Sequence, residues 1–250
     1  MKLHEIVIQI RPRTPYQAMD LGVLMAKRWF LQLVGLWLAA ALPLLILSFI
    51  LGWLLPGKIL TNAFVCFWIL HPISEPVMIS WIGPALFGTP PSFFTTLKRW
   101  RQGVSILQIA AILFGRFNPM RSFNYAVLQL EQLRGKPRKQ RLQQLCQNQD
   151  GSLVLTLCCF ALELLIACSL FILGVTLIPE EIRWFTTGEA AYVLVSWFLV
   201  VLFVVATLLV APFYVCMGFM LYISRRVELE AWDIEIGFKA LNDRLHKEAV

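Results

Sequence analysis

Four apolar stretches of this 250-residue chain decide its fold class, because each is long enough to cross a membrane. They lie at residues 29–55, 59–88, 152–179 and 190–223, and a helix needs about 20 predominantly apolar residues to cross the hydrocarbon core. Hydrophobic residues make up 58% of the chain and charged residues 15%, against roughly 45–50% and about 25% in globular domains. The sequence predicts an all-α, polytopic transmembrane helical bundle of about four spans, with residues 1–250 as one integral membrane domain.

The second stretch is the least regular of the four. It contains Pro72, Pro76 and Pro84, and each proline removes a backbone donor and kinks a helix. A bundle can satisfy the freed groups with neighbouring helices or water, so the pattern predicts a broken span. Residues 104–117 offer too few apolar positions for a crossing and indicate an interfacial or re-entrant piece.

Lysine and arginine are distributed very unevenly over the connections. Of the 22 basic residues, only Lys58 and Arg183 lie in the two short connections, and the other 20 lie in the N-terminal arm, the segment 89–151 and the tail 224–250. Cytoplasmic loops carry such an excess of positive charge. We therefore expect a multi-pass protein of the bacterial inner membrane with both termini in the cytoplasm, and an uncleaved first span.

Cysteines and enzyme motifs give little sign of chemistry. Five of the six cysteines fall within apolar stretches, only Cys146 lies in a cytoplasmic segment, and none are spaced as CxxC. Disulfides and a metal site are therefore not expected. The chain contains no GxxxxGK loop, GxSxG elbow or HExxH pair. The expectation is a protein without enzymatic activity or cofactor and without a nucleic-acid partner.

The cytoplasmic segments are short but patterned. "TPYQ" at 14–17 has the form of a capping box that starts a helix running into the first span. Residues 3–10 alternate like a strand or an extended arm, and this choice stays open. Residues 118–150 combine leucines with basic residues around Gly135 and Pro137. This pattern suits a helical hairpin on the anionic inner leaflet, or a solvated loop. The candidate patch for binding lipid or a partner is Arg134, Lys136, Arg138, Lys139 and Arg141.

The fourth stretch ends in "LYISRRVELEAWDIEIGFKAL", residues 221–241. Apolar residues recur there at spacings of three and four, which predicts that the span continues as an amphipathic helix with Trp232 at headgroup level. Arg226 lies four residues before Glu230, close enough to pair on the surface for a few tenths of a kcal/mol. Arg225 and Glu228 form a similar pair at a spacing of three.

The segment "LYISRRVELEAWDIE" resembles the closing signature of the membrane domain attached to some bacterial glycerophosphodiester phosphodiesterases and of its stand-alone relatives. The matching positions are Leu221, Tyr222, Arg226, Glu230, Asp233 and Glu235, with Trp232 in the aromatic position, whereas Ser224, Glu228 and Ala231 depart from the pattern. The entry "TPYQAMDLGVLMAKRWF" is also similar to the start of such domains. The resemblance implies a helical membrane domain without phosphodiesterase activity, because that catalytic barrel takes about 250 residues. It makes Arg226, Glu230, Trp232, Asp233 and Glu235 a signature segment.

Three ionisable residues within the spans are candidates for function, because burying them is costly. His71 and Glu75 lie four apart in the broken span, and Glu163 lies near the middle of the third. Together they could relay protons, hold a cation or pair with a substrate amine. Alternatively, His71 and Glu75 mark a helix break, and Glu163 is protonated or hydrogen-bonded within the bundle.

These features lead to two main functional hypotheses. The first is a scaffold or accessory subunit that docks a cytoplasmic partner or anionic lipid in membrane or envelope assembly. The alternative is a small transporter or channel subunit that uses the intramembrane acids. A membrane-embedded enzyme ranks third, because His71 and Glu75 lack a recognisable nucleophile or metal set.

Overall fold

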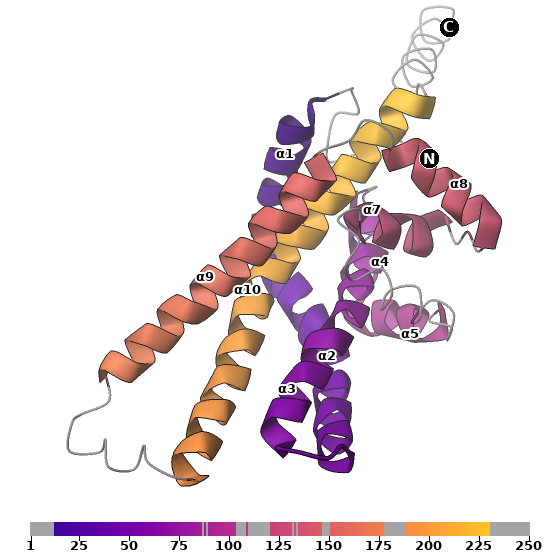
Figure 1. Ribbon diagram of the computed structural model, residues 1–250. Coiled ribbons are helices and arrows are strands. Elements are labelled where there is room, and N and C mark those ends of the chain that lie inside the picture. Colours follow the sequence, from indigo (N-terminus) through magenta and orange to yellow (C-terminus); the bar gives the residue numbers. More distant parts are fainter. Residues whose placement is uncertain are drawn as a thin grey trace, which may run out of the picture.

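The computed structural model describes residues 13–86, 88, 90–103, 109, 121–131, 133, 135–146, 151–177 and 189–230, and every regular element within them is a helix. The helices are α1 (Pro15–Arg28), α2 (Phe30–Leu54), α3 (Ile59–Leu70), η2 (His71–Ile73), α4 (Glu75–Leu86), α5 (Phe93–Gly103), α7 (Arg121–Ala126), η4 (Val127–Glu131), α8 (Gly135–Cys146), α9 (Gly151–Leu177) and α10 (Glu189–Glu230) (Figure 1). Four stretches are long and apolar enough to cross a membrane, at Phe30–Leu54, Ile59–Leu86, Gly151–Leu177 and Val193–Glu230. The predicted all-α polytopic bundle is confirmed.

The predicted capping box starts α1. The Gln17 N–H donates to the Thr14 hydroxyl at 3.4 Å, and the Thr14 N–H donates to the Gln17 side chain at 3.4 Å. Pro15 occupies the first helical position, where its missing N–H costs nothing. The helix ends at Trp29, and α2 begins at the next residue. The capping box therefore determines the residue at which α1, the helix that precedes the first span, begins.

Replacing Thr14 with alanine should lower the free energy of unfolding by about 1 kcal/mol, because the Gln17 N–H loses its acceptor. Thermal unfolding of the purified protein, followed by circular dichroism, measures the change. Tyr16→Ala is the matched control, since Tyr16 is exposed on the same helical turn and makes no cap. An equal loss in both variants would contradict the role of the cap.

The second span is broken, as predicted. It consists of α3, the short 3₁₀ turn η2 and α4. Pro72 and Pro76 lack the N–H groups that a continuous helix would use here. Ser74 closes the 3₁₀ turn, because both its N–H and its hydroxyl donate to the His71 carbonyl, at 2.9 Å and 2.6 Å. The break places His71 and Glu75 at the junction of two helices.

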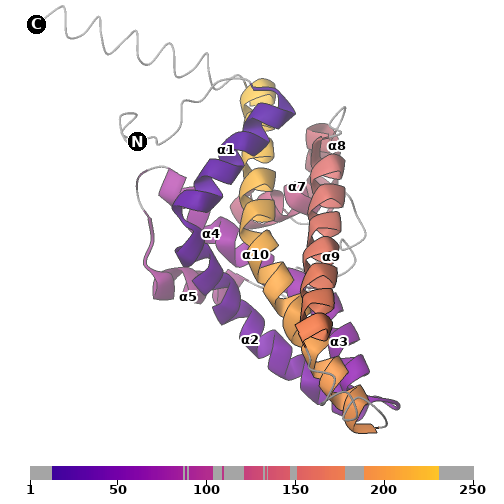
Figure 2. The same cartoon turned by 90° about the vertical axis from the view of Figure 1, so that its left-hand side faces the viewer.

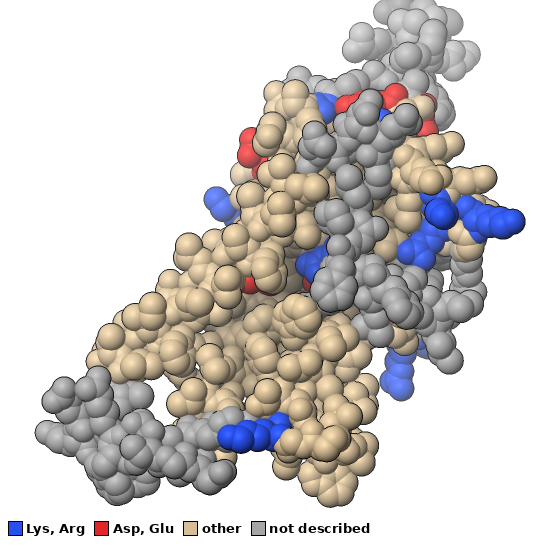
Figure 3. All heavy atoms as spheres, in the orientation of Figure 1, with Lys and Arg blue, Asp and Glu red and all other residues tan. Residues whose placement is uncertain are grey.

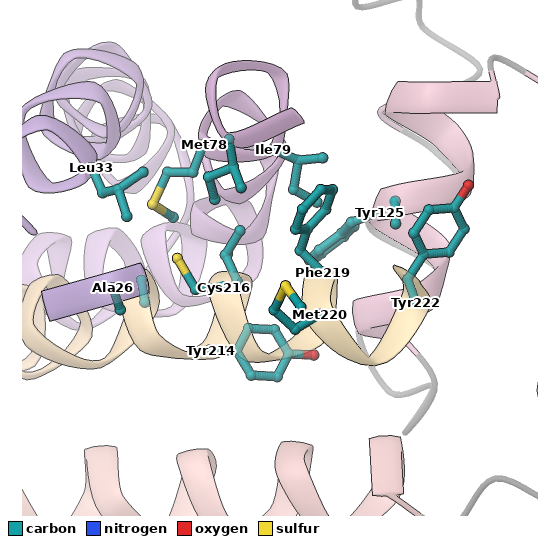
Figure 4. Close-up of a cluster of buried hydrophobic side chains, with 14 of the residues drawn as sticks. Ala26, Leu33, Met78, Ile79, Tyr125, Tyr214, Cys216, Phe219, Met220 and Tyr222 are labelled. Carbon is teal, nitrogen blue, oxygen red and sulfur yellow. The ribbon is translucent and has the colours of Figure 1, made fainter. Parts of the chain in front are cut away.

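The core of the bundle surrounds α4, in which ten of twelve residues are buried. Figure 4 shows Met78 of α4 beside Leu33 of α2 and Cys216 of α10, and Ile79 of α4 beside Phe219 of α10 and Tyr125 of α7. Helix α1 packs against another side of α10, and the two helices lie side by side in Figures 1 and 2. A Cβ added at Gly22 of α1 would lie 2.5 Å from the Met217 Cα. Glycine therefore allows the two backbones to approach this closely.

Helix α9 is buried only in its first part, although near its other end Phe171 lies against Phe198 of α10, with ring centres 6.1 Å apart. Its buried residues are Gly151, Ser152, Leu155 and Cys159, and Figure 1 shows the rest of the helix running away from α10. Leu157, Leu165 and Leu177 are between 59% and 71% exposed. Such large apolar side chains without protein contacts fit a helix that faces lipid.

The segment between the second and third spans differs in part from the expectation. Gly135, with φ at +65°, begins α8 and separates it from α7 and η4, so two helical pieces flank the glycine as predicted. Pro137 lies inside α8. However, Ser122 to Ala126 of α7 are buried, so α7 is part of the core and does not lie on a leaflet surface. The expectations for residues 3–10, for 104–117 apart from Ile109, and for 231–250 lie outside the described residues.

Candidate functional site

A charged cluster lies in the core where α4, α7 and α10 meet. We call His71, Glu75, Arg121 and Tyr214 the core cluster. The Arg121 guanidinium lies 3.6 Å from a Glu75 carboxyl oxygen and donates to the Tyr214 hydroxyl at 2.9 Å. It also lies over the Tyr214 ring, 4.6 Å from the ring centre. His71 and Glu75 are each 2% exposed, so Arg121 compensates a carboxylate that water cannot reach.

The protonation of His71 follows from its neighbours. Its Nδ1 lies 3.1 Å from the Trp68 carbonyl oxygen, which can only accept, so Nδ1 carries a proton. Its Nε2 faces the Glu75 carboxyl at 3.8 Å. The His71 ring therefore presents Nε2 to the Glu75 carboxyl, and Arg121 is the charged group that compensates Glu75.

The hydrogen bonds continue from Arg121 to α9. The Thr156 hydroxyl donates to the Ser152 carbonyl at 2.9 Å, and it lies 3.3 Å from the Tyr214 hydroxyl. Because the Thr156 hydroxyl already donates its proton to the Ser152 carbonyl, the Tyr214 hydroxyl is the donor to Thr156. The chain of donors runs from Arg121 through Tyr214 and Thr156 to the α9 backbone, which orients Arg121 toward Glu75.

Tyr125 of α7 lies beside the core cluster, close enough to interact electrostatically with Glu75 and Arg121. The pKa of Tyr125 lies well above its usual range. The main cause is burial of the side chain, and the second is the nearby charge of Glu75. The phenol therefore stays neutral and adds no charge to the cluster. Among the described residues, no group of three or more His, Cys, Asp or Glu is placed to hold a metal ion.

The sequence predicted a site from His71, Glu75 and Glu163, and the structure brings His71 and Glu75 together at the break of the second span. Glu163 lies on α9, one turn beyond Cys159, which is within electrostatic reach of Glu163, Glu75 and Arg121. Arg121 was not predicted as a site residue, because in the sequence it is one of the basic residues of a cytoplasmic segment. No local pattern identifies it, because its partners are 46 and 93 positions away in the chain.

A lateral groove lies between α3, α9 and α10, where α9 runs away from the bundle. Its volume is about 750 Å³, and Glu163, Trp68 and Phe203 are among the residues that line it. Phe203 also contacts His71, with ring centres 5.7 Å apart, so the groove ends beside the core cluster. Figure 3 shows a hollow at half the height of this face, where blue and red atoms lie among tan residues that are neither acidic nor basic.

A second polar group joins the end of α10 to α8 and η4. We call it the signature network: Glu131, Arg141, Tyr222, Arg226 and Glu230. Tyr222 donates to Glu131 at 2.6 Å, and Arg226 donates to Tyr222 at 3.2 Å and to Glu230 at 2.7 Å. Arg141 bridges Glu131, at 3.0 Å, and Glu230. The Arg226–Glu230 pair was expected to be a simple surface pair, and it is instead part of a half-buried network across three elements.

The structure explains some of the signature residues. Tyr222, Arg226 and Glu230 tie α10 to the segment before α9. The pair Arg225–Glu228 lies outside this network, with a distance of 2.8 Å. Trp232, Asp233 and Glu235 lie outside the described residues.

The candidate basic patch divides into two groups. Arg138 donates to the Asn124 side chain, and Arg141 belongs to the signature network, so both hold α8 against the bundle. Burial lowers the pKa of Arg141, but the hydrogen bonds to Glu230 and Glu131 outweigh it and raise the pKa overall. Lys136 and Lys139 are exposed. Arg134 lies outside the described residues.

Comparisons with protein-family models, with characterised proteins and with solved structures found no match to this chain.

Proposed function

We propose that the chain is a non-enzymatic accessory protein of the bacterial inner membrane that docks an acidic cytoplasmic partner through α8. The observation that carries this proposal is the position of α8, which stands apart from the four spans (Figure 1). Its arginines hold it to the bundle, and its exposed lysines, Lys136 and Lys139, face away from those contacts. A held helix that presents positive charge is a preorganised docking element.

The anchoring of α8 supports docking of a protein rather than contact with lipid alone. Leu145 is fully buried, and Arg141 reaches both η4 and the end of α10. The helix is therefore fixed to the bundle and is not free to settle on a bilayer surface. Anionic lipid is a better match for α5, where Phe94 is 80% exposed and Lys98, Arg99 and Arg101 lie on the same short helix.

The sidedness of the protein is part of the proposal. Helices α1 and α8 and the end of α10 lie at one end of the bundle, and the turn that contains Lys58 lies at the other (Figure 1). All but two of the 22 basic residues belong to the N-terminal arm, the segment 89–151 and the tail 224–250, and α1, α8 and the end of α10 are described parts of these segments. Positive charge favours the cytoplasmic side, which supports cytoplasmic termini.

A small transporter or channel subunit is the second candidate function. The observation that favours it is that the lateral groove, with Glu163 in its wall, ends beside the core cluster. Against it, Glu75 is compensated by Arg121 in a packed core, which is the arrangement of a structural ion pair. We therefore rank docking first.

The docking proposal predicts that Lys136→Glu with Lys139→Glu lowers recovery of cytoplasmic partners at least about tenfold, since reversing charges at an interface costs several kcal/mol. The measurement is quantitative cross-linking in native membranes from a photoreactive residue placed at Gln140. Lys98→Glu with Arg101→Glu on α5 is the control, because it reverses the same number of charges on the same side of the bundle. Equal loss in the two variants, at equal abundance, would mean that α8 is not the docking element.

A further inference from the structure

The lateral groove is a cavity of the bundle to which the docking function assigns no occupant. Its floor is protein, because Leu60 and Leu202 are at most 9% exposed, whereas Leu164 and Ile172 at its rim are 57% and 62% exposed. It is therefore open on the side where α9 leaves the bundle. A volume of about 750 Å³ lies within the range of small-molecule sites.

The surroundings of the opening restrict what can enter it. Most of the exposed residues of α9 and of the first half of α10 are large and apolar, and they face the hydrocarbon of the bilayer. A molecule that reaches the groove must therefore be soluble in the membrane. This requirement excludes free polar metabolites and favours amphiphiles with an apolar chain.

The lining of the groove selects the charge of the occupant. Among its described lining residues Glu163 is the one acidic or basic side chain, and five aromatic residues accompany it: Phe64, Trp68, Phe160, Phe171 and Phe203. Aromatic faces attract cations, and together with a carboxylate they form a typical site for ammonium groups. An anionic head group would face the Glu163 carboxylate there, and among the described lining residues none is basic and could pair with a phosphate.

The geometry points to a binding site for a cationic amphiphile, with an ammonium group beside Glu163 and an apolar chain along α3 and α10. This inference goes beyond the docking function and does not depend on it. The ammonium group compensates a carboxylate in apolar surroundings, and the chain fills a groove that opens toward lipid. A monocation is expected to bind better than a zwitterion, because the phosphate of a zwitterion finds no partner.

The test is isothermal titration of the full chain in a neutral alkyl maltoside detergent with dodecyltrimethylammonium. Dodecylphosphocholine, which adds a phosphate to the same chain and ammonium group, separates a free cationic amphiphile from a zwitterionic lipid. We expect the cation to bind about tenfold more tightly than the zwitterion, and Glu163→Gln to weaken its binding by a similar factor, because the variant loses the electrostatic attraction between the carboxylate and the quaternary ammonium group. Glu163→Asp, which keeps the charge, should retain most of the affinity.

A second pair of variants tests the groove itself and leaves Glu163 unchanged. Ala167→Phe fills the groove from α9 and should abolish binding. Ala161→Phe places the same side chain on an exposed position of α9 that lies outside the groove, and should leave binding unchanged. Gel filtration and circular dichroism confirm that each variant is folded.

Three results would overturn the inference. Equal affinity for the cation and the zwitterion would show that the groove holds ordinary lipid. Unchanged binding in folded Glu163→Gln or in Ala167→Phe would place the site elsewhere. A dimer that Ala167→Phe separates into monomers would show that a second copy of the chain covers the groove.

Discussion

Replacing Arg121 with methionine should lower the free energy of unfolding by about 3–5 kcal/mol, because it leaves the Glu75 carboxylate buried without its compensating charge. The same change removes the donor to Tyr214, so the chain of hydrogen bonds to α9 loses its start. The expected result is a large fall in thermal midpoint and in the yield of monodisperse protein. Arg101→Met is the control, since Arg101 is exposed on α5 and should cost less than about 1 kcal/mol.

The double variant Arg121→Met with Glu75→Met distinguishes loss of a charge partner from loss of packing. Apolar replacement of a whole buried pair is often neutral or stabilising, so the double variant should recover most of the stability. If the double variant is less stable than Arg121→Met alone, then Glu75 contributes through contacts other than Arg121. If Arg121→Met is as stable as the wild type, the pair is not a structural element.

Replacing Gly22 with alanine should lower the free energy of unfolding by about 3 kcal/mol, at the upper end of overpacking effects. The added Cβ would lie 2.5 Å from the Met217 Cα and 2.9 Å from the Cys216 carbonyl carbon. These are backbone atoms of a long helix and cannot move aside by a change of rotamer. We expect α1 to separate from α10.

Gly35→Ala is the matched control for Gly22→Ala. The nearest atom to a Cβ at Gly35 is a ring carbon of Phe93 at 3.5 Å, which is an ordinary contact. Alanine is also a better helix former than glycine by up to about 1 kcal/mol, so this variant should be neutral or stabilising. Limited proteolysis at the N-terminal side of α1 would report its release. Equal stability of the two variants would contradict close packing of α1 on α10.

The parts of the fold that depend on local sequence were predictable. Span lengths follow from the number of consecutive apolar residues, and the start of α1 follows from the Thr14 capping box. The break at His71 follows from two nearby prolines. Each of these features is set by residues within one or two helical turns, so their physical cause can be read without knowledge of the neighbours.

The candidate sites depend on packing between distant segments and were only partly predictable. Arg121 looks like one more basic residue of a cytoplasmic segment, and its burial results from the packing of α7 against α4 and α10. Arg138 and Arg141 have the composition of a docking patch, yet their partners are Asn124, Glu131 and Glu230. Charge alone does not distinguish a residue that binds a partner from one that binds its own chain.

The length of α10 links the two ends of the molecule mechanically. Its 42 residues form a rod of about 60 Å, with Phe203 in the lateral groove and Tyr222 in the signature network. Between these points α10 packs closely on α1 at Met217 and also contacts α9, α7 and α4, so the helix is held near its middle and joins the groove to the network. Pro212 interrupts the backbone hydrogen bonds between the groove and Met217. The stiffness of the helix at this proline sets how much of a displacement at the groove reaches α8.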